Sequence, residues 1–242
     1  MDTQSVARQL TDWLKQQVEA ANCRGVVFGL SGGVDSAVVA ALAQRAFGKE
    51  ALGVIMPCHS DPQDAIDGEL CARALHLEHM TVDLSDTFDQ LCRTLGVSGD
   101  VSRLAVANLK PRLRMTTLYY YAALRRALVL GGSNRSELTI GYFTKHGDAG
   151  VDLMPLAGLV KHQVWELAAY LGVPQSIIDK RPSAGLWAGQ YDEQEMGITY
   201  RQLDEYILTG NATKEVRSAV DRLHFGSEHK RRMPLKPDIS MQ

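Results

Sequence analysis

The segment Gly29–Ser36, which reads GLSGGVDS, combines small, hydroxyl and acidic residues between two apolar runs. It follows GVVF and precedes AVVAALAQRAF, an order typical of a buried strand, a loop and a helix. Such a loop exposes consecutive backbone N–H groups at a helix N-terminus, where the helix dipole favours an anion. Gly32 and Gly33 allow close backbone approach. Ser31 and Ser36 add hydroxyl donors, so the loop is predicted to hold phosphate.

Asp35 does not fit a bare anion site, because a carboxylate beside phosphate is repulsive unless a cation lies between them. Mg²⁺ is the natural bridge. The loop lacks the G-x-x-x-x-G-K-[ST] pattern of the common phosphate loop, and it also lacks G-x-G-x-x-G. The alternative is a purely structural turn. Such a turn needs only one glycine and no particular order of Ser, Gly and Asp.

The rest of the chain alternates between short apolar runs and amphipathic segments. Strands are predicted at 26–30, 51–57, 79–84 and 127–132, and helices at 4–21, from 35, at 61–75, from the third strand to Leu95, and at 160–171, 199–208 and 213–224. Residues 101–127 are expected to form one long helix or two, with core positions at Leu104, Leu109, Leu113, Leu118, Tyr121 and Leu124. The stretches 142–152 and 181–197 show no regular spacing of apolar residues that would predict a helix or a strand.

This order predicts an α/β fold, a single domain with a central parallel sheet flanked by helices on both faces. Ligands of such folds bind at the carboxyl ends of the strands. Two strands end in glycines, before Ser31 and before Ser133, and their loops are expected at the same sheet edge. Asp35 and Glu137 follow these two strands, so both carboxylates can meet at one metal ion.

The composition is that of a globular chain, with 45% hydrophobic and 22% charged residues among 242. A formal charge of -2 argues against nucleic acid or an acidic membrane surface as the main partner. No stretch approaches the roughly 18 apolar residues of a membrane span, and the N-terminus has no secretory signal. The cysteines form no C-x-x-C pair and are interpreted as reduced thiols of a cytoplasmic protein; they are Cys23, Cys58, Cys71 and Cys92.

The loop resembles the S-G-G-x-D-S signature of the ATP pyrophosphatases, which cut ATP between its α and β phosphates and have the adenine nucleotide alpha hydrolase-like fold. Four further segments resemble the ammonia-dependent NAD synthetases, in order and at compatible spacing. They are NLKPRLRM (108–115), LVLGGSNRSELTIGYFTKHGDAGVDLMPLAGLVK (128–161), PSAGLWAGQYDEQEMGITY (182–200) and HKR (229–231). The resemblance covers residues 4–236.

The resemblance implies amidation of nicotinic acid adenine dinucleotide (deamido-NAD) to NAD, with ATP and Mg²⁺. The substrate carboxylate attacks the α-phosphorus, pyrophosphate leaves, and ammonia attacks the mixed anhydride to release AMP. Residues 1–242 are expected to form one synthetase domain without the N-terminal glutamine amidase domain of some relatives. Ammonia is then free, unless a separate subunit supplies it. A homodimer is also expected, as in relatives.

The resemblance assigns roles to individual residues. Asp35 and Glu137 are expected to bind Mg²⁺, and Asp35 and Lys161 to be catalytic. The expected ATP-binding residues are Gly29, Leu30, Ser31, Gly32, Gly33, Val34, Asp35, Ser36, Gly132, Lys161 and Ser183. The expected deamido-NAD-binding residues are Arg112, Lys145, Asp152, His229 and Lys230. Gly132 stands where many relatives carry Thr.

Two alternatives remain open at this point. Another ATP pyrophosphatase, a tRNA-thiolating enzyme or one like GMP synthetase, would use the same loop. The isolated cysteines and the net charge of -2 speak against tRNA thiolation. An inactive nucleotide-binding module would keep the loop without catalysis, but the presence of both Asp35 and Glu137 disfavours it.

The irregular stretches 142–152 and 181–197 are expected to be lids that order over the substrates and exclude water.

Overall fold

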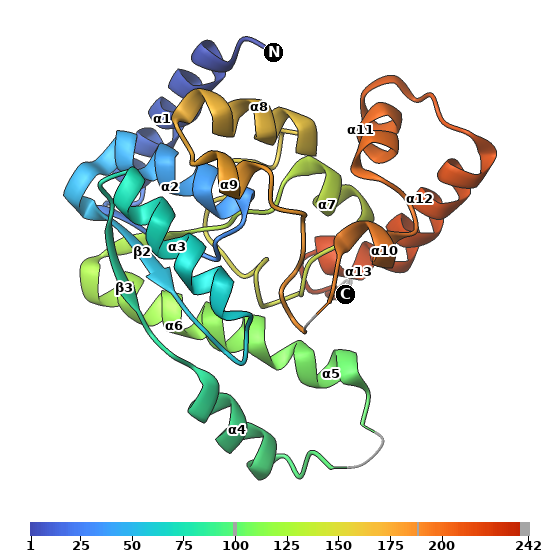
Figure 1. Cartoon of the computed structure of the whole chain (residues 1–242), viewed down its shortest axis with the longest axis horizontal. Helices are drawn as coiled ribbons and strands as arrows, with labels where there is room; N and C mark the ends of the chain where they lie inside the picture. The colour runs from blue at the N-terminus through green and yellow to red at the C-terminus, as the bar shows by residue number, and fades with distance from the viewer. Residues whose placement is uncertain (99–100, 188, 238–242) are drawn as a thin grey trace, which may run out of the picture.

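Four parallel strands form a central sheet in the order β3-β2-β1-β4. The computed structural model of the chain describes residues 1–98, 101–187 and 189–237. The strands are β1 (Gly25–Gly29), β2 (Ala51–Ile55), β3 (Glu78–Thr81) and β4 (Ala127–Leu130). In register, Val27 of β1 lies opposite Leu52 of β2 and Val129 of β4. The predicted parallel sheet with helices on both faces is confirmed (Figure 1).

The described helices comprise those predicted, with bounds close to the predicted ones, and four short helices that were not predicted, at 135–140, 175–178, 192–196 and 228–231. In chain order the helices are α1 (Thr3–Ala20), α2 (Val34–Phe47), α3 (Pro62–Ala74), α4 (Ser85–Thr94), α5 (Arg103–Ala107), α6 (Leu109–Arg125), α7 (Arg135–Ile140), α8 (Lys161–Leu171), α9 (Gln175–Ile178), α10 (Asp192–Met196), α11 (Tyr200–Thr209), α12 (Lys214–Gly226) and α13 (Glu228–Arg231), with a 3₁₀ turn at Gly48–Glu50. Local signals set their ends. The Asp61 side chain caps α3 by accepting from the Gln63 N–H, and Pro62 occupies the first turn.

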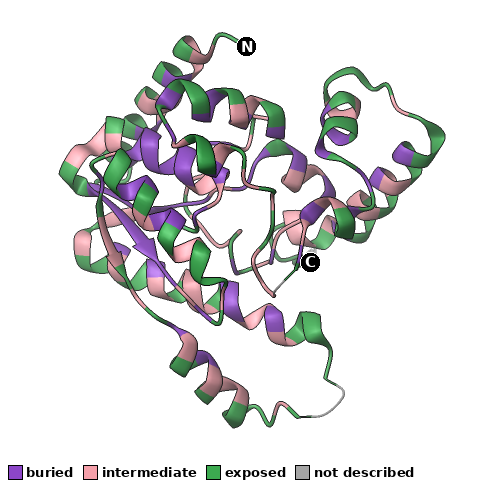
Figure 2. Cartoon of the chain, in the orientation of Figure 1, coloured by how far each residue is buried: buried purple, intermediate pink, exposed green. Residues whose placement is uncertain are grey.

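Successive residues of a strand point to opposite faces, and the two faces of this sheet bury different cores. Val26 and Phe28 pack with α1, α2 and α8 on one face. Val27 and Val129 pack on the other face, against α4 and α6. Figure 2 shows the central strands buried between these two layers. The sheet is therefore shielded on both faces, and its carboxyl edge is the part left for ligands.

A third, smaller core joins α7 to the C-terminal helices α11 and α12, which project at the right of Figure 1. Its buried members are Ile140, Met196, Ile198, Tyr200, Leu203, Val216 and Val220. Two of the stretches with a role at the site, around residue 137 and around residue 200, are held together by this cluster.

Some details differ from the sequence predictions. Residues 101–127 form two helices, α5 and α6, which meet at Asn108. Leu104 and Leu124 are expected in the core but are 56% and 64% exposed. The buried residue of α5 is Ala107, and the face of α6 that packs on the sheet carries Leu118 and Ala122. The strand predicted at 79–84 ends at Thr81, at the edge of the sheet. The stretch 181–197 contains α10.

Candidate functional site

The loop after β1 is shaped by its neighbours in the fold. The Leu30 N–H donates to the Val54 carbonyl at 2.9 Å, which continues the alignment with β2. Gly32 has φ of +77°, and a Cβ there would lie 2.4 Å from the carbonyl oxygen of Asp64 in α3. Only glycine fits this position without a backbone shift. The loop is therefore pressed against the start of α3.

The two serines of the loop close it upon itself. Ser36 Oγ donates to the Gly33 carbonyl at 2.8 Å and accepts from the Ser31 N–H at 3.2 Å, and the two serine hydroxyls are 3.0 Å apart. Gly33 is the N-cap of α2 and makes no side-chain cap hydrogen bond. The first N–H groups of a 14-residue helix therefore face the loop without a side-chain acceptor, as an anion site requires.

The end of β4 lies against this loop. A Cβ on Gly132 would lie 3.6 Å from Cβ of Asp35 and 3.7 Å from N of Ser36, an ordinary contact distance. Asn134 is fully buried and caps α7 in a reciprocal box with Glu137: its Oδ1 accepts from the Glu137 N–H, and Glu137 Oε2 accepts from the Asn134 N–H. The Asn134 amide also donates to Asp35 Oδ1 at 2.9 Å. One residue thus joins both strand ends.

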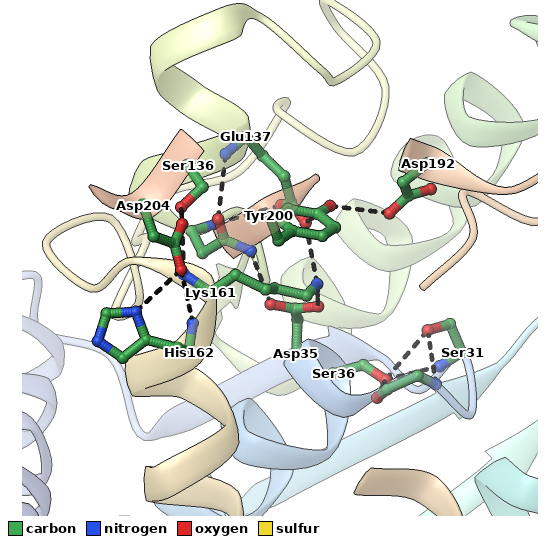
Figure 3. Close-up of polar contacts among 12 residues, drawn as sticks. Ser31, Asp35, Ser36, Ser136, Glu137, Lys161, His162, Asp192, Tyr200 and Asp204 are labelled. Atoms are coloured by element: carbon green, nitrogen blue, oxygen red, sulfur yellow. Dashed lines mark hydrogen bonds and ion pairs between the residues drawn. The ribbon is translucent and has the colours of Figure 1, made fainter. Parts of the chain in front are cut away.

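Lys161, the first residue of α8, places its ammonium group between Asp35 and Glu137 (Figure 3). Its Nζ lies 2.5 Å from Asp35 Oδ2 and 3.3 Å from Glu137 Oε1. The side chain is only 2% exposed, against 20% for Asp35 and 14% for Glu137. Asp35 and Glu137 therefore lie close together at the edge expected from their positions after β1 and β4, and both contact the Lys161 ammonium.

The charges of this cluster perturb one another. Burial raises the pKa of Glu137 above its usual range; the Lys161 ammonium opposes this, and Asp35 and Asp192 add to it. Burial alone would lower the pKa of Lys161, but Asp35 and Glu137 hold it above its ordinary value. The ammonium is therefore charged at neutral pH. A buried cation between acceptors is well suited to the phosphate of a nucleotide.

Sequence reasoning missed the residues that hold Lys161 in place. Its backbone N–H donates to Ser136 Oγ at 3.1 Å, and Ser136 in turn donates to Asp204 Oδ1. Asp204 Oδ2 accepts from the His162 N–H at 2.9 Å. Ser136, Lys161 and Asp204 come from α7, α8 and α11, so no single-segment pattern marks them. Their contacts fix the start of α8 against the metal-ligand candidate Glu137.

Tyr200 and Asp192 form a further part of the cluster that the sequence did not single out. The Tyr200 hydroxyl lies 3.3 Å from Glu137 Oε1 and donates to Asp192 Oδ2 at 2.8 Å. Its ring centroid is 4.9 Å from the Lys161 ammonium. Asp192 is 4% exposed, and its second oxygen, Oδ1, has no hydrogen-bond partner among the described residues. Burial raises the pKa of Asp192. Both residues belong to the segment 182–200, one of those that resemble the ammonia-dependent NAD synthetases.

The residues predicted to bind the dinucleotide form a second group. The Arg112 guanidinium lies 3.5 Å from the Lys145 carbonyl, and the Lys145 ammonium donates to the His229 carbonyl at 2.6 Å. Lys230 donates to the carbonyls of Gly141 and Phe143, at 2.9 Å each, and burial lowers its pKa. The segments that carry Arg112, Lys145 and His229 thus lie side by side.

Asp152 and Ser183 lie apart from those contacts. Asp152 accepts from the Tyr119 hydroxyl at 3.0 Å and from the Val129 N–H at 2.8 Å, at the end of β4. Ser183 Oγ accepts from the Gly185 N–H at 3.1 Å, and no contact joins it to the Asp35 cluster in the described part of the chain. The nucleotide roles expected for both residues remain predictions.

Lys180, which the sequence analysis did not single out, lies behind the Gly29–Ser36 loop. Lys180 donates to Asp64 Oδ1 at 2.9 Å and to Asp67 Oδ2 at 2.5 Å, both in α3. Because α3 also packs against Gly32, these ion pairs connect the start of the 181–197 stretch to the loop.

All four cysteines are free, as predicted. Within the described residues, no helix is long and apolar enough to cross a membrane.

Comparison with known proteins agrees with this arrangement. Residues 6–234 match the NAD synthase family. The NH(3)-dependent NAD(+) synthetase of Carboxydothermus hydrogenoformans is 51% identical over 231 residues, which cover 95% of each chain. The NMN synthetase of Francisella tularensis has a TM-score of 0.95 at 36% identity, covering 99% of this chain and 100% of that one. The NH3-dependent NAD synthetase of Campylobacter jejuni, in complex with the nitrate ion, has a TM-score of 0.81 at 28% identity, covering 98% and 100%. The chain belongs to the NAD synthase family.

Proposed function

We propose that this chain is an ammonia-dependent ligase that amidates the carboxylate of deamido-NAD to give NAD, with ATP as the second substrate. The observation that carries the proposal is the meeting of the phosphate loop with the Asp35, Lys161 and Glu137 charge cluster at the carboxyl edge of the sheet. This is the site that such folds use for nucleotides. The family and the curated relatives supply the reaction that the site performs.

The reaction proceeds in two displacements. A carboxylate oxygen of the substrate attacks the α-phosphorus of ATP, the bond to the bridging oxygen breaks, and pyrophosphate leaves. Ammonia then attacks the carbonyl carbon of the acyl adenylate, AMP leaves with the carboxylate oxygen, and the amide nitrogen loses a proton. Two anions must approach each other in the first step, so the site has to supply positive charge and fix an in-line geometry.

The residues of this chain fit those demands. The free N–H groups at the start of α2, together with Ser31 and Ser36 of the loop, would hold the pyrophosphate portion of ATP. The ammonium of Lys161 is buried between Asp35 of α2 and Glu137 of α7, and its charge would stabilise the α-phosphate as negative charge develops. The lids expected at 142–152 and 181–197 exclude water, which would otherwise hydrolyse the acyl adenylate.

Mg²⁺ is part of this proposal. The donor set suits it, because Asp35 and Glu137 offer hard oxygen ligands and already share one cation, the Lys161 ammonium. The described residues contain no cluster of three or more His, Cys, Asp or Glu arranged for a metal. Mg²⁺ typically takes one or two carboxylates and completes its shell with water and substrate phosphates, so two protein ligands suffice. When bound, it neutralises the charge of the leaving pyrophosphate.

A second candidate substrate follows from one comparison. The Francisella tularensis protein, whose TM-score of 0.95 exceeds the 0.81 of the Campylobacter jejuni enzyme, is an NMN synthetase. Amidation of nicotinic acid mononucleotide would use the same carboxylate chemistry at the same Asp35 cluster. The two substrates differ in the adenylate half, which only the dinucleotide possesses. The curated relatives favour the dinucleotide.

One assay separates these possibilities. Purified protein is incubated with ATP, Mg²⁺ and ammonium chloride, together with deamido-NAD, nicotinic acid mononucleotide or neither. NAD formed with a higher kcat/KM than NMN supports the proposal, and the reverse preference supports the mononucleotide. Tight ATP binding without pyrophosphate release on either substrate would identify an inactive binding module.

The proposal extends to the assembly and the location of the protein. The chain acts as a homodimer in the cytoplasm, a location with which its four free cysteines agree. Light scattering coupled to size-exclusion chromatography measures the oligomeric state. A monomer at the concentrations of the assay would overturn it.

A further inference from the structure

Lys161 occupies the position between the two carboxylates that are proposed to hold Mg²⁺. Its ammonium lies 2.5 Å from Asp35 Oδ2 and 3.3 Å from Glu137 Oε1 and is 2% exposed. The other side chains that lie within hydrogen-bond distance of the pair are neutral: the Asn134 amide donates to Asp35 Oδ1, and the Tyr200 hydroxyl lies beside Glu137 Oε1. In the free protein, Lys161 is therefore the cation that contacts both acidic side chains.

A divalent ion cannot share this position unchanged. Mg²⁺ and an ammonium group would both need the Asp35 oxygen that now contacts Nζ, and two cations in a buried site repel each other strongly. A metal ion that binds both carboxylates must therefore displace the ammonium. Displacing a buried lysine without a new anionic partner is costly, because its charge would be left unpaired.

ATP supplies that partner. In the proposed function its phosphates bind at the loop beside Asp35, where a charge-assisted bond from Lys161 to phosphate would replace the bond to carboxylate. We propose that Lys161 keeps Mg²⁺ out of the Asp35 and Glu137 site until ATP draws the ammonium away, so that metal and nucleotide bind with positive coupling. This inference rests on the proposed Mg²⁺ site.

The coupling has a thermodynamic signature that does not depend on catalysis. If Lys161 competes with the metal, removing its charge tightens metal binding in the absence of nucleotide. By reciprocity, the gain in metal affinity on adding nucleotide is smaller in the variant than in the wild type. A lysine that only contacted phosphate would leave metal binding to the nucleotide-free protein unchanged.

The test is titration of the full chain with Mn²⁺, followed by electron paramagnetic resonance of the free ion, without nucleotide and with the non-cleavable analogue α,β-methylene-ATP. Lys161→Met is expected to bind Mn²⁺ at least about tenfold more tightly than the wild type without nucleotide. Lys161→Arg keeps the charge and is expected to bind as weakly as the wild type. Lys110→Met removes another buried lysine, which contacts the His59 and Leu186 carbonyls, and serves as a matched control without effect.

The possible failures are distinguishable. Equal Mn²⁺ affinity of Lys161→Met and the wild type, with Asp35-dependent binding in both, overturns the competition and leaves the metal site standing. Tight binding that survives Asp35→Asn in the Lys161→Met background places the metal elsewhere and overturns the Mg²⁺ proposal. Should Lys161→Met be too unstable for titration, the Lys161→Gln variant is assayed by the rise in melting temperature on adding Mn²⁺. A rise no larger than that of the wild type contradicts the inference.

Discussion

The side-chain amide of Asn134 donates a hydrogen bond to the Asp35 carboxylate at 2.9 Å, although 99 positions separate the two residues in sequence. Asn134 also caps α7 and thereby orients Glu137. The two strand ends of the site are therefore joined by one neutral side chain. Because the amide fixes one carboxylate oxygen of Asp35, it leaves the other oxygen for a cation.

Replacing Asn134 separates its two roles. Ser is as good an N-cap as Asn, so Asn134→Ser is expected to keep α7 capped and to lose only the bond to Asp35. Asn134→Ala loses both, and its free energy of unfolding should be lower than that of Asn134→Ser by about 1 kcal/mol. The KM for ATP and Mg²⁺ should rise about tenfold in both variants, because a hydrogen bond to a charged group is lost. Wild-type KM values in Asn134→Ser would show that the bond to Asp35 has no catalytic role.

Asp35 is the residue whose loss should affect the first chemical step most. Asp35→Ala is expected to reduce pyrophosphate release by at least about 100-fold, because it removes one of two carboxylates from the proposed metal and leaves Lys161 mispositioned. The fold should persist, as circular dichroism would check. Asp12→Asn, on the exposed side of α1, is the matched carboxylate control. Turnover in Asp35→Ala close to that of this control would contradict the assignment.

A substitution of Arg112 tests the group of residues expected to bind deamido-NAD. Arg112→Ala should raise the KM for deamido-NAD by about 10- to 100-fold and change kcat less, since an exposed guanidinium beside Lys145 is suited to a diphosphate. The KM for ATP should stay near the wild-type value. Steady-state kinetics with each substrate varied in turn provide the measurement. Unaltered saturation by deamido-NAD would refute the role.

The fold followed from the sequence more fully than the site did. Strand and helix alternation, and the glycine-terminated strands before Ser31 and Ser133, predicted the sheet and the shared edge of Asp35 and Glu137 because these signals are local. The prediction that Leu104 and Leu124 are buried was wrong. Helical period alone does not say which face of a two-helix segment meets the sheet.

The missed site residues have a different cause. Tyr200, Asp192 and Asp204 contact the cluster only after α7, α8 and α11 pack together, so no spacing along the chain could reveal them. Asn134 did carry a readable signal, because Asn followed three residues later by Glu is the pattern of a capping box. The position of Lys161 came from resemblance to the family, and its contact with both carboxylates is a property of the folded chain.

Glu137 gives a pH dependence of stability with a definite sign. Burial raises its pKa from 4.5 to about 8, so the folded protein retains this proton at pH values where the unfolded chain has released it. Its contribution to the free energy of unfolding is therefore fully present below 4.5 and is lost as pH rises to about 8. Urea denaturation across this range should show a steeper decline in the wild type than in Glu137→Gln, because the raised pKa of Asp192 still contributes in both proteins. Equal slopes in the two proteins would contradict the shifted pKa.

The proposed reaction requires that the substrate carboxylate be activated by transfer of AMP from ATP. Deamido-NAD labelled with ¹⁸O in its carboxylate is converted in the presence of ATP, Mg²⁺ and ammonium chloride, and the products are analysed by ³¹P NMR and mass spectrometry. One labelled oxygen is predicted in each AMP formed, with none in pyrophosphate. Label in pyrophosphate or inorganic phosphate, or AMP without label alongside newly formed NAD, would contradict the account.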